Sequence, residues 1–276
     1  MQRKLTLENE AKPLNLIARD VFQQVKNEEE TSVLLTEVKL SDNNEDEIYI
    51  DANHIEVSEC KRKYVLTEAP WASRASTSWD KFWLMIEQLE TTTIVMLCQS
   101  FKQIQYWPEN PGETLKLGFD LEVALQEETK RNEADFIIRT FILTNTRTNL
   151  TRKVQHLHYI AWPDFGAPSN PHSFLNFLEV VRNSGCFEDN VGPPVVHCMT
   201  GRGRSGTFAL VDSAIAISKE KDISIQDIKS LLLNMRSQRM GLVESSKQFQ
   251  FVISTILLAH SQLDTNTDEQ NKDHED

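Results

Sequence analysis

The sequence lacks any apolar run that approaches the ~20 residues needed for a membrane-spanning helix. Its first residues, MQRKLTLENEAKP, contain no apolar stretch of the length found in secretory signal peptides. No repeat and no Gly/Ser-rich linker marks an internal boundary. We therefore expect a soluble, cytoplasmic protein without a transmembrane segment, in which residues 14–260 form a single domain.

Cysteine is scarce, and no two cysteines have the CxxC spacing of a metal site. The four are Cys60, Cys98, Cys186 and Cys198. In a reducing compartment, scattered cysteines are free thiols and are often buried. This interpretation fits the first three, whereas Cys198 lies in a different sequence context. No metal-ligand cluster is visible elsewhere in the chain, so we expect no bound metal.

Positive charge is in short supply, with 29 lysines and arginines against 41 acidic residues and a net charge of -12. The acidic residues concentrate in 28–30, in 42–47 and in the tail. A negative field of this kind argues against nucleic acid and acidic membranes as partners. Residues 261–276 are polar, acidic and free of aromatics, so we predict that they form a disordered tail.

The pattern of apolar residues alternates between strands and helices along the chain. Continuous β-branched runs predict buried strands, and apolar residues at helical spacing predict amphipathic helices. Strands are expected at 48–55, 63–70, 92–98, 135–145, 150–162 and 193–198. Helices are expected at 79–90, 173–185, 205–219, 224–238 and 245–260. Together these elements predict an α/β protein with a mixed sheet. The polar TRTN turn between 135–145 and 150–162 predicts that these two strands form a hairpin.

Glycine concentrates where the strand at 193–198 meets the next helix, in the sequence HCMTGRGRSG, here called the phosphate loop (residues 197–206). Such a turn can aim successive backbone N–H groups into one concavity, and the helix N-terminus adds partial positive charge. The planar guanidinium of Arg204 can grip two phosphate oxygens. We expect the same positive surroundings to lower the pKa of Cys198, and a thiolate is the nucleophilic form. The loop therefore predicts a phosphate beside a thiolate.

HCMTGRGRSGTF resembles the HCxxGxGR[ST]G signature of protein tyrosine phosphatases. Other segments match that family in order: IYIDANHI (48–55), KYVLTEAP (63–70), QSFKQIQYWP (99–108), the acid-loop segment HYIAWPDFGAP (158–168) and the glutamine-loop segment MRSQRMGLVESSKQFQF (235–251). The RMGL run is typical of the small non-receptor branch. The resemblance covers roughly residues 14–258 and implies the catalytic domain of that family, a central, highly twisted mixed sheet flanked by helices.

The resemblance also implies catalytic roles. Cys198 would attack phosphorus, Arg204 would bind the phosphate oxygens, and Asp164 would act first as general acid and then as general base. Ser205 would stabilise the departing thiolate and Gln248 would position the hydrolytic water. No cofactor is needed. The implied substrate-binding set comprises Met199, Thr200, Gly201, Arg202, Gly203, Arg204, Asp164 and Gln248.

The sequence departs from the family pattern at several places. The Arg-Tyr pair of the family, whose Tyr stacks on the substrate ring, appears as Glu28 and Glu29. The segment before Gln105 is too short for the acidic residue that braces the signature arginine. The first Gln of the glutamine loop appears as Glu244, and Arg202 stands where the family usually has an aliphatic residue.

Three hypotheses follow from these observations. The first is a protein tyrosine phosphatase that acts in signal transduction as a monomer, on phosphotyrosine-containing proteins, through a phosphocysteine intermediate and with reduced efficiency. The second is a pseudophosphatase that binds phosphorylated partners, motivated by Glu244, by the lost tyrosine and by the missing acidic brace of the signature arginine. The third is a phosphatase acting on phosphoinositide or on phosphoserine/threonine, motivated by a second positive charge at Arg202 and by the missing stacking tyrosine.

Overall fold

The structure is a computed structural model that describes residues 5–6, 13–28, 39–41, 47–71, 78–99, 105–130, 135–164 and 166–272. Within these residues, eight strands form one mixed sheet. In their order across the sheet they are β4 (Ala52–Val57), β5 (Arg62–Thr67), β11 (Val195–His197), β6 (Thr93–Met96), β10 (Leu150–Tyr159), β9 (Phe136–Asn145), β8 (Leu121–Lys130) and β7 (Thr114–Lys116). The four central strands from β5 to β10 are parallel and the outer pairs are antiparallel.

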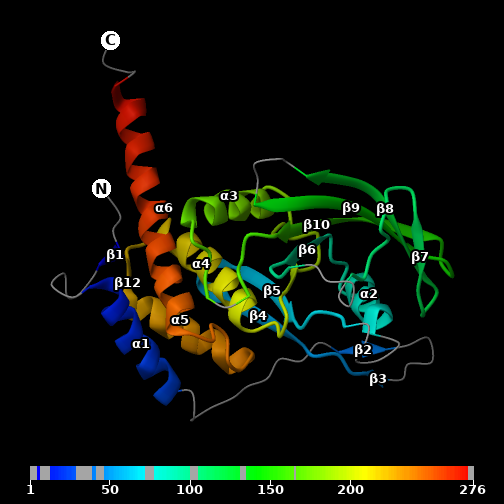
Figure 1. Cartoon of the computed structure of the whole chain (residues 1–276), viewed down its shortest axis with the longest axis horizontal. Coiled ribbons are helices and arrows are strands. Elements are labelled where there is room, and N and C mark those ends of the chain that lie inside the picture. Colours follow the sequence, from blue (N-terminus) through cyan, green and yellow to red (C-terminus); the bar gives the residue numbers. More distant parts are fainter. Residues whose placement is uncertain are drawn as a thin grey trace.

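Helices cover the sheet unevenly. They are α1 (Leu14–Glu28), α2 (Ser78–Gln88), α3 (Pro171–Arg182), α4 (Gly203–Ser218), α5 (Ile225–Gln238) and α6 (Ser246–Lys272), with a 3-10 turn at Ser58–Cys60. In Figure 1, α1, α5 and α6 gather at one end of the molecule and α2 lies at the other. Two short sheets pair β1 (Leu5–Thr6) with β12 (Ile223–Ser224) and β2 (Leu40–Ser41) with β3 (Glu47–Ile48). No described helix combines the length and apolarity that a membrane crossing requires.

Local sequence explains where several elements begin and end. All four residues of β6 are buried, as expected for an apolar strand with neighbours on both sides. The side-chain oxygen of Asn145 accepts hydrogen bonds from the N–H groups of Arg147 and Thr148, which closes the turn between β9 and β10. Helix α5 begins at a capping box, in which Ser224 and Asp227 bond each other's backbone N–H.

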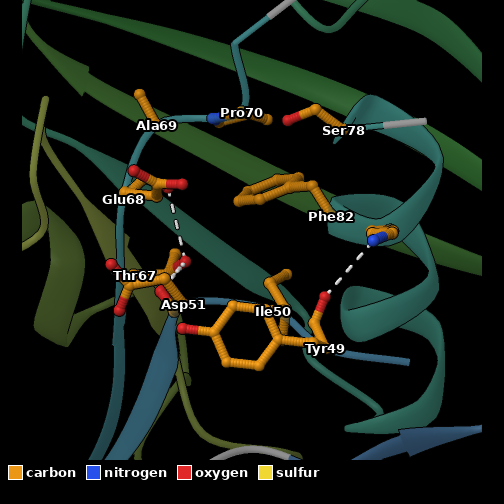
Figure 2. A pocket seen from close by; sticks show the side chains of 10 residues that line it. Tyr49, Ile50, Asp51, Thr67, Glu68, Ala69, Pro70, Ser78 and Phe82 are labelled. Carbon is orange, nitrogen blue, oxygen red and sulfur yellow. Dashed lines mark hydrogen bonds between the residues drawn. The ribbon is translucent and has the colours of Figure 1, made fainter. Parts of the chain in front are cut away.

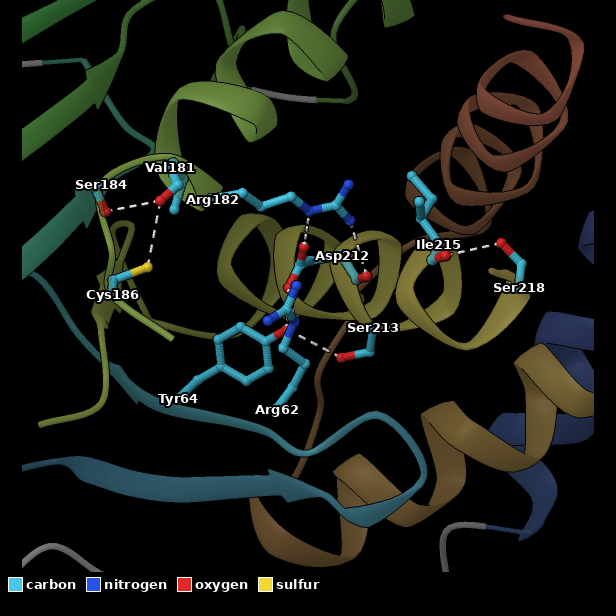
Figure 3. Close-up of polar contacts among 10 residues, drawn as sticks. All are labelled: Arg62, Tyr64, Val181, Arg182, Ser184, Cys186, Asp212, Ser213, Ile215 and Ser218. Carbon is cyan, nitrogen blue, oxygen red and sulfur yellow. Dashed lines mark hydrogen bonds and ion pairs between the residues drawn. The ribbon is translucent and has the colours of Figure 1, made fainter. Parts of the chain in front are cut away.

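Helix α4 is buried along almost its whole length, and this includes the charged side chain of Asp212. Arg182 Nε donates to one carboxylate oxygen at 2.6 Å, while Tyr64 Oη donates to the other at 2.5 Å and Arg62 Nε lies 3.1 Å from it. Figure 3 shows Arg182 reaching down from α3 while Arg62 and Tyr64 rise from β5. This Asp212 cluster therefore fastens α4 between a helix and the sheet.

The observed fold confirms the expected α/β class with its mixed sheet and flanking helices. The hairpin of β9 and β10 also matches the prediction. The predicted strand at 48–55 is divided, because residues 47–48 pair with β2 whereas β4 begins at Ala52. Helix α6 continues to Lys272 and covers most of the segment predicted as a disordered tail. The domain boundary near residue 260 stays a prediction.

Candidate active site

The phosphate loop begins at the centre of the sheet. Strand β11 lies between β5 and β6 and runs parallel to both, so Cys198 emerges at their shared carboxyl edge. Ligands of open α/β sheets characteristically bind at this edge. Cys198 is only 3% exposed, and the loop leads directly into the N-terminus of α4. The nucleophile predicted from sequence thus lies at the floor of a site, with a helix terminus facing it.

Arg239 fixes the orientation of the peptide units in this loop. Its Nη2 donates to the carbonyl of Thr200 at 3.1 Å and its Nε to the carbonyl of Gly201 at 2.9 Å. A trans peptide places its N–H opposite its C=O, so the N–H groups that follow these carbonyls point away from Arg239. Gly201 has φ 66°, and a Cβ there would lie 2.1 Å from the carbonyl oxygen of Thr67. Only glycine fits this position, and the loop has the geometry of an anion-binding nest.

Arg204 and Asp164 meet above the loop. Arg204 is 7% exposed; its Nη1 donates to the carbonyl of Leu97 at 3.2 Å and its Nη2 to Asp164 Oδ1 at 3.4 Å. The side chain of Asp164 is 49% exposed. Trp162 is fully buried and donates to the carbonyl of Gly166, which anchors the segment that carries Asp164. Among the described residues, Asp164 is the one carboxylate within ion-pair distance of Arg204.

Ser205 and Gln248 take different positions around the loop. Ser205 is fully buried, and its hydroxyl finds no hydrogen-bond partner among the described atoms. Gln248 is 7% exposed; its Oε1 accepts from the N–H of Glu244 at 2.8 Å. A Cβ added at Gly203 would lie 2.9 Å from Gln248 Nε2 and 2.3 Å from Glu244 Oε2. Both side chains therefore lie against the phosphate loop.

A buried chain of hydrogen bonds, which the sequence analysis did not find, lies behind the loop. Tyr106 Oη is 2.8 Å from His197 Nε2 and 2.9 Å from His156 Nε2. Arg139 Nη1 is 3.4 Å from His156 Nδ1 and 3.3 Å from His158 Nδ1. Burial lowers the pKa of His197 to about 3, that of His158 to about 4, and that of His156 well below its ordinary value. All three imidazoles are therefore neutral near pH 7.

Because each of the three imidazole rings is neutral, it carries a single ring proton, and the hydrogen bonds show which nitrogen bears it. Arginine only donates, so the Nδ1 atoms that face it accept and the Nε2 atoms carry the protons. His156 then donates to Tyr106 Oη, and the Tyr106 hydroxyl donates to His197 Nε2. The remaining proton of His197 lies on Nδ1, 3.5 Å from the carbonyl oxygen of Cys198. The chain of hydrogen bonds thus ends on the backbone of Cys198 and orders the strand that precedes it.

Two hollows share Tyr49, Ile50 and Asp51 in their linings, and Tyr49 is 70% exposed. One, of about 160 Å³, is lined by Arg202, Arg239, Met240 and residues 49–53. Asp51 in this hollow pairs with Arg239, and no described carboxylate pairs with the exposed guanidinium of Arg202. The other hollow, of about 150 Å³, is shown in Figure 2, where the Phe82 ring points toward Glu68.

The other three cysteines match the expectation of free thiols. Burial raises the pKa of Cys186 to about 12 and also raises the pKa of Cys60 and of Cys98. Two of the departures noted in the sequence fall partly outside the described residues. Helix α1 ends at Glu28, and neither Glu29 nor the segment 100–104 before Gln105 is described.

A buried cysteine in an anion nest, a buried arginine and a facing half-exposed carboxylate form the arrangement expected of a cysteine-dependent phosphatase on an α/β domain. The chain belongs to the protein-tyrosine phosphatase family, whose family model matches residues 21–258. No described group of three or more His, Cys, Asp or Glu side chains is arranged to hold a metal ion.

The relatives include both non-receptor and receptor-type proteins. Mouse tyrosine-protein phosphatase non-receptor type 2 is 40% identical over 228 residues, which cover 80% of this chain and 53% of that protein. Drosophila melanogaster non-receptor type 61F is 39% identical over 219 residues, covering 76% of this chain and 38% of the relative. Chicken receptor-type tyrosine-protein phosphatase S is 33% identical over 217 residues, covering 76% of this chain and 13% of the relative. The chain spans about half the length of the non-receptor type 2 proteins that it matches.

Proposed function

We propose that this protein is a protein tyrosine phosphatase that hydrolyses phosphotyrosine on proteins through a phosphocysteine intermediate. The observation that carries the proposal is the contact between Arg204 and Asp164 above the loop of Cys198. It brings an anion clamp and a proton donor to the same phosphate site as a nucleophile. Membership of the family and the similarity to named tyrosine phosphatases support the same activity.

In the first half of the reaction, the thiolate of Cys198 attacks phosphorus and the bond from phosphorus to the tyrosine oxygen breaks. The inward N–H groups of the loop and the guanidinium of Arg204 stabilise the negative charge of the transferring group. Asp164, in its protonated form, gives its proton to the leaving phenolate. Its half-exposed position beside Arg204 suits a group that must meet both solvent and substrate.

In the second half, water attacks the phosphocysteine, Asp164 accepts its proton, and the sulfur–phosphorus bond breaks to release phosphate. The unpartnered hydroxyl of Ser205 is available to donate to the departing thiolate of Cys198. Gln248, whose amide nitrogen lies against Gly203, is positioned to orient the attacking water. We further propose that the protein acts in cytoplasmic signal transduction, as a monomer.

The decisive experiment is turnover of a phosphotyrosine peptide by wild type beside Cys198→Ser and Asp164→Ala. We expect Cys198→Ser to abolish release of phosphate, since serine supplies no thiolate. Asp164→Ala should lower kcat while peptide binding persists, because the acid acts only after binding. Cys60→Ser is the matched control, since its half-buried thiol lies outside the site, and it should turn over like wild type.

Equal turnover by wild type and Cys198→Ser would exclude the proposed mechanism. Wild type that binds the peptide but forms no phosphocysteine in rapid-quench measurements would instead favour the pseudophosphatase hypothesis. Full activity of Asp164→Ala would remove Asp164 from the role of acid.

The exposed guanidinium of Arg202 favours a second candidate, hydrolysis of a phosphoinositide. This side chain adds a positive charge beside the loop that no described carboxylate neutralises. A substrate panel compares phosphotyrosine, phosphoserine and phosphothreonine peptides with phosphoinositides. Faster release from a phosphoinositide than from the phosphotyrosine peptide would favour this candidate, and the reverse order would exclude it.

A further inference from the structure

A carboxylate lies against the loop that is built to attract anions. Glu244 Oε1 accepts a hydrogen bond from the hydroxyl of Thr200 at 3.4 Å. Its other oxygen, Oε2, lies only 2.3 Å from the place that a Cβ at Gly203 would take. Both oxygens thus contact residues of the phosphate loop. A side chain of the same sign as the expected ligand is an unfavourable choice for tight binding.

The backbone holds Glu244 in this place. Val243, directly before it, is fully buried and has φ 58°, a left-handed conformation that a β-branched residue rarely adopts. The N–H of Val243 donates to the carbonyl of Arg202 at 3.3 Å, and Arg236 Nη2 donates to the carbonyl of Val243 at 2.8 Å. The N–H of Glu244 donates to Gln248. Glu244 is therefore presented to the loop by a constrained turn.

The charge of Glu244 is not neutralised by its described surroundings. No lysine, arginine or histidine in the part of the chain that the structure describes lies within ion-pair distance of this carboxylate. The nitrogens of Arg239 are occupied by Asn53, Asp51 and the loop carbonyls. The guanidinium of Arg204 is directed at Leu97 and Asp164. A ligand in the loop therefore meets the negative charge of Glu244 with only solvent to screen it.

We propose that Glu244 is a specificity-determining residue that opposes dianions in the phosphate loop and thereby weakens binding of phosphate, substrate and product alike. The inference rests on the proposed function only in that the loop binds phosphate. Repulsion grows with the charge of the ligand, so inositol headgroups with several phosphates are disfavoured more strongly than phosphotyrosine. Product phosphate, which is mostly dianionic above neutral pH, leaves more readily for the same reason.

The test is binding of tungstate, a dianion with the shape of phosphate, to the full chain by titration calorimetry at pH 7. Glu244→Gln keeps the size and the hydrogen-bonding reach of the side chain but removes the charge. For an exposed charge at the rim, we expect it to bind tungstate roughly three- to tenfold more tightly than wild type, with the gain shrinking at high salt. Glu244→Asp keeps the charge and should stay near wild type.

Glu220→Gln is the matched control, since Glu220 is exposed just beyond the far end of α4. That helix places it about 24 Å from the loop, beyond a Debye length at ordinary salt. Equal or weaker binding by Glu244→Gln than by wild type would overturn the inference while leaving the proposed function intact. Absence of tungstate binding by every variant would overturn the proposed function itself, because the loop would then not be a phosphate site.

Discussion

Helix α4 carries two charged sites, and they differ in how far their carboxylates are buried and paired. In its middle, the fully buried carboxylate of Asp212 accepts hydrogen bonds from Tyr64 and Arg182 and forms an ion pair with Arg62. At its N-terminus, Arg204 faces a half-exposed carboxylate, beside a buried hydroxyl that has no described partner. Satisfied buried networks stabilise a fold, whereas unsatisfied groups in a cleft are typical of a site that waits for a ligand. Mutations at the two sites should therefore affect different properties.

Removing Arg204 should have the largest effect, and it should fall on activity. We expect Arg204→Ala to lower kcat/KM by roughly 10³–10⁵, the range seen when an arginine that neutralises a transferring phosphoryl group is lost. Arg204→Lys keeps the charge but not the planar fork, so it should recover only part of the loss. Steady-state kinetics on an aryl phosphate measure both. Wild-type kinetics in Arg204→Lys would show that the paired geometry is unimportant.

Asp212→Asn should affect stability instead. It leaves Arg62 and Arg182 without their counter-charge, and breaking a buried ion pair costs about 3–5 kcal/mol. Urea unfolding measures the loss. At temperatures where the variant is folded, its KM for an aryl phosphate should equal that of wild type. A large change in KM with unchanged stability would contradict the assignment of the cluster to the fold.

Acidification should destabilise the protein through the histidines behind the loop. Their pKa values are lowered in the folded state, so the unfolded chain takes up protons first as the pH falls below about 6.5. The stabilisation that each neutral histidine provides above that pH is lost as the pH falls toward the pKa of the folded state, about 4 for His158 and about 3 for His197. At pH 5 the loss is about 2 kcal/mol for each of these two groups.

Replacing one of these histidines checks the sign and the size of the effect. His158→Asn should lose about 2 kcal/mol less than wild type between pH 7 and pH 5, because one titrating group is gone. His172→Asn, at an exposed position on α3, is the control and should lose as much as wild type. Equal pH dependence in all three proteins would rule out the buried neutral histidines as the cause.

Ser205→Ala should have the smallest effect on stability, within about 0.5 kcal/mol, because it removes a hydroxyl that no described group bonds. Its effect should appear in the second half of the reaction. A hydrogen bond to a charged group is worth about 1.5–3 kcal/mol, so breakdown of phosphocysteine should slow by roughly 10- to 100-fold. Rapid-quench measurement of phosphocysteine detects its accumulation. If Ser205→Ala slowed the formation of phosphocysteine as much as its breakdown, Ser205 would have a different role in the mechanism.

Sequence reasoning succeeded where neighbouring residues alone determine the structure. The strand, loop and helix around Cys198 follow one another along the chain, and each has a strong local pattern. It failed where local patterns are weak. Strand β8 carries Glu127, Glu128 and Lys130 in its exposed half, so it lacks the apolar run of a buried strand. Helix α1 was also not predicted, although the apolar face it buries against the core has a helical period.

The groups that order the site come from distant segments and could not be assembled from sequence. Arg239 reaches the loop from beyond α5, and Tyr106 bonds His156 and His197, which lie on two strands that come later in the chain at no regular spacing. One part of this network could have been predicted from the sequence. His156 and His158 are two residues apart in a strand, so both side chains point to one face of the sheet. Their common partner, Arg139, lies opposite His156 on the neighbouring strand, and only the register of the hairpin shows it.

The place of β11 in the sheet has a consequence for biosynthesis. Residues 195–197 insert between β5 and β6, two strands that leave the ribosome more than a hundred residues and nearly a hundred residues earlier. Until then the sheet has a gap at its centre, and pairing across such long chain separations is slow. The step that closes the gap also delivers Cys198 to its loop. A nascent chain therefore gains its proposed nucleophile and the middle of its core in one event, and a chain truncated before Val195 gains neither.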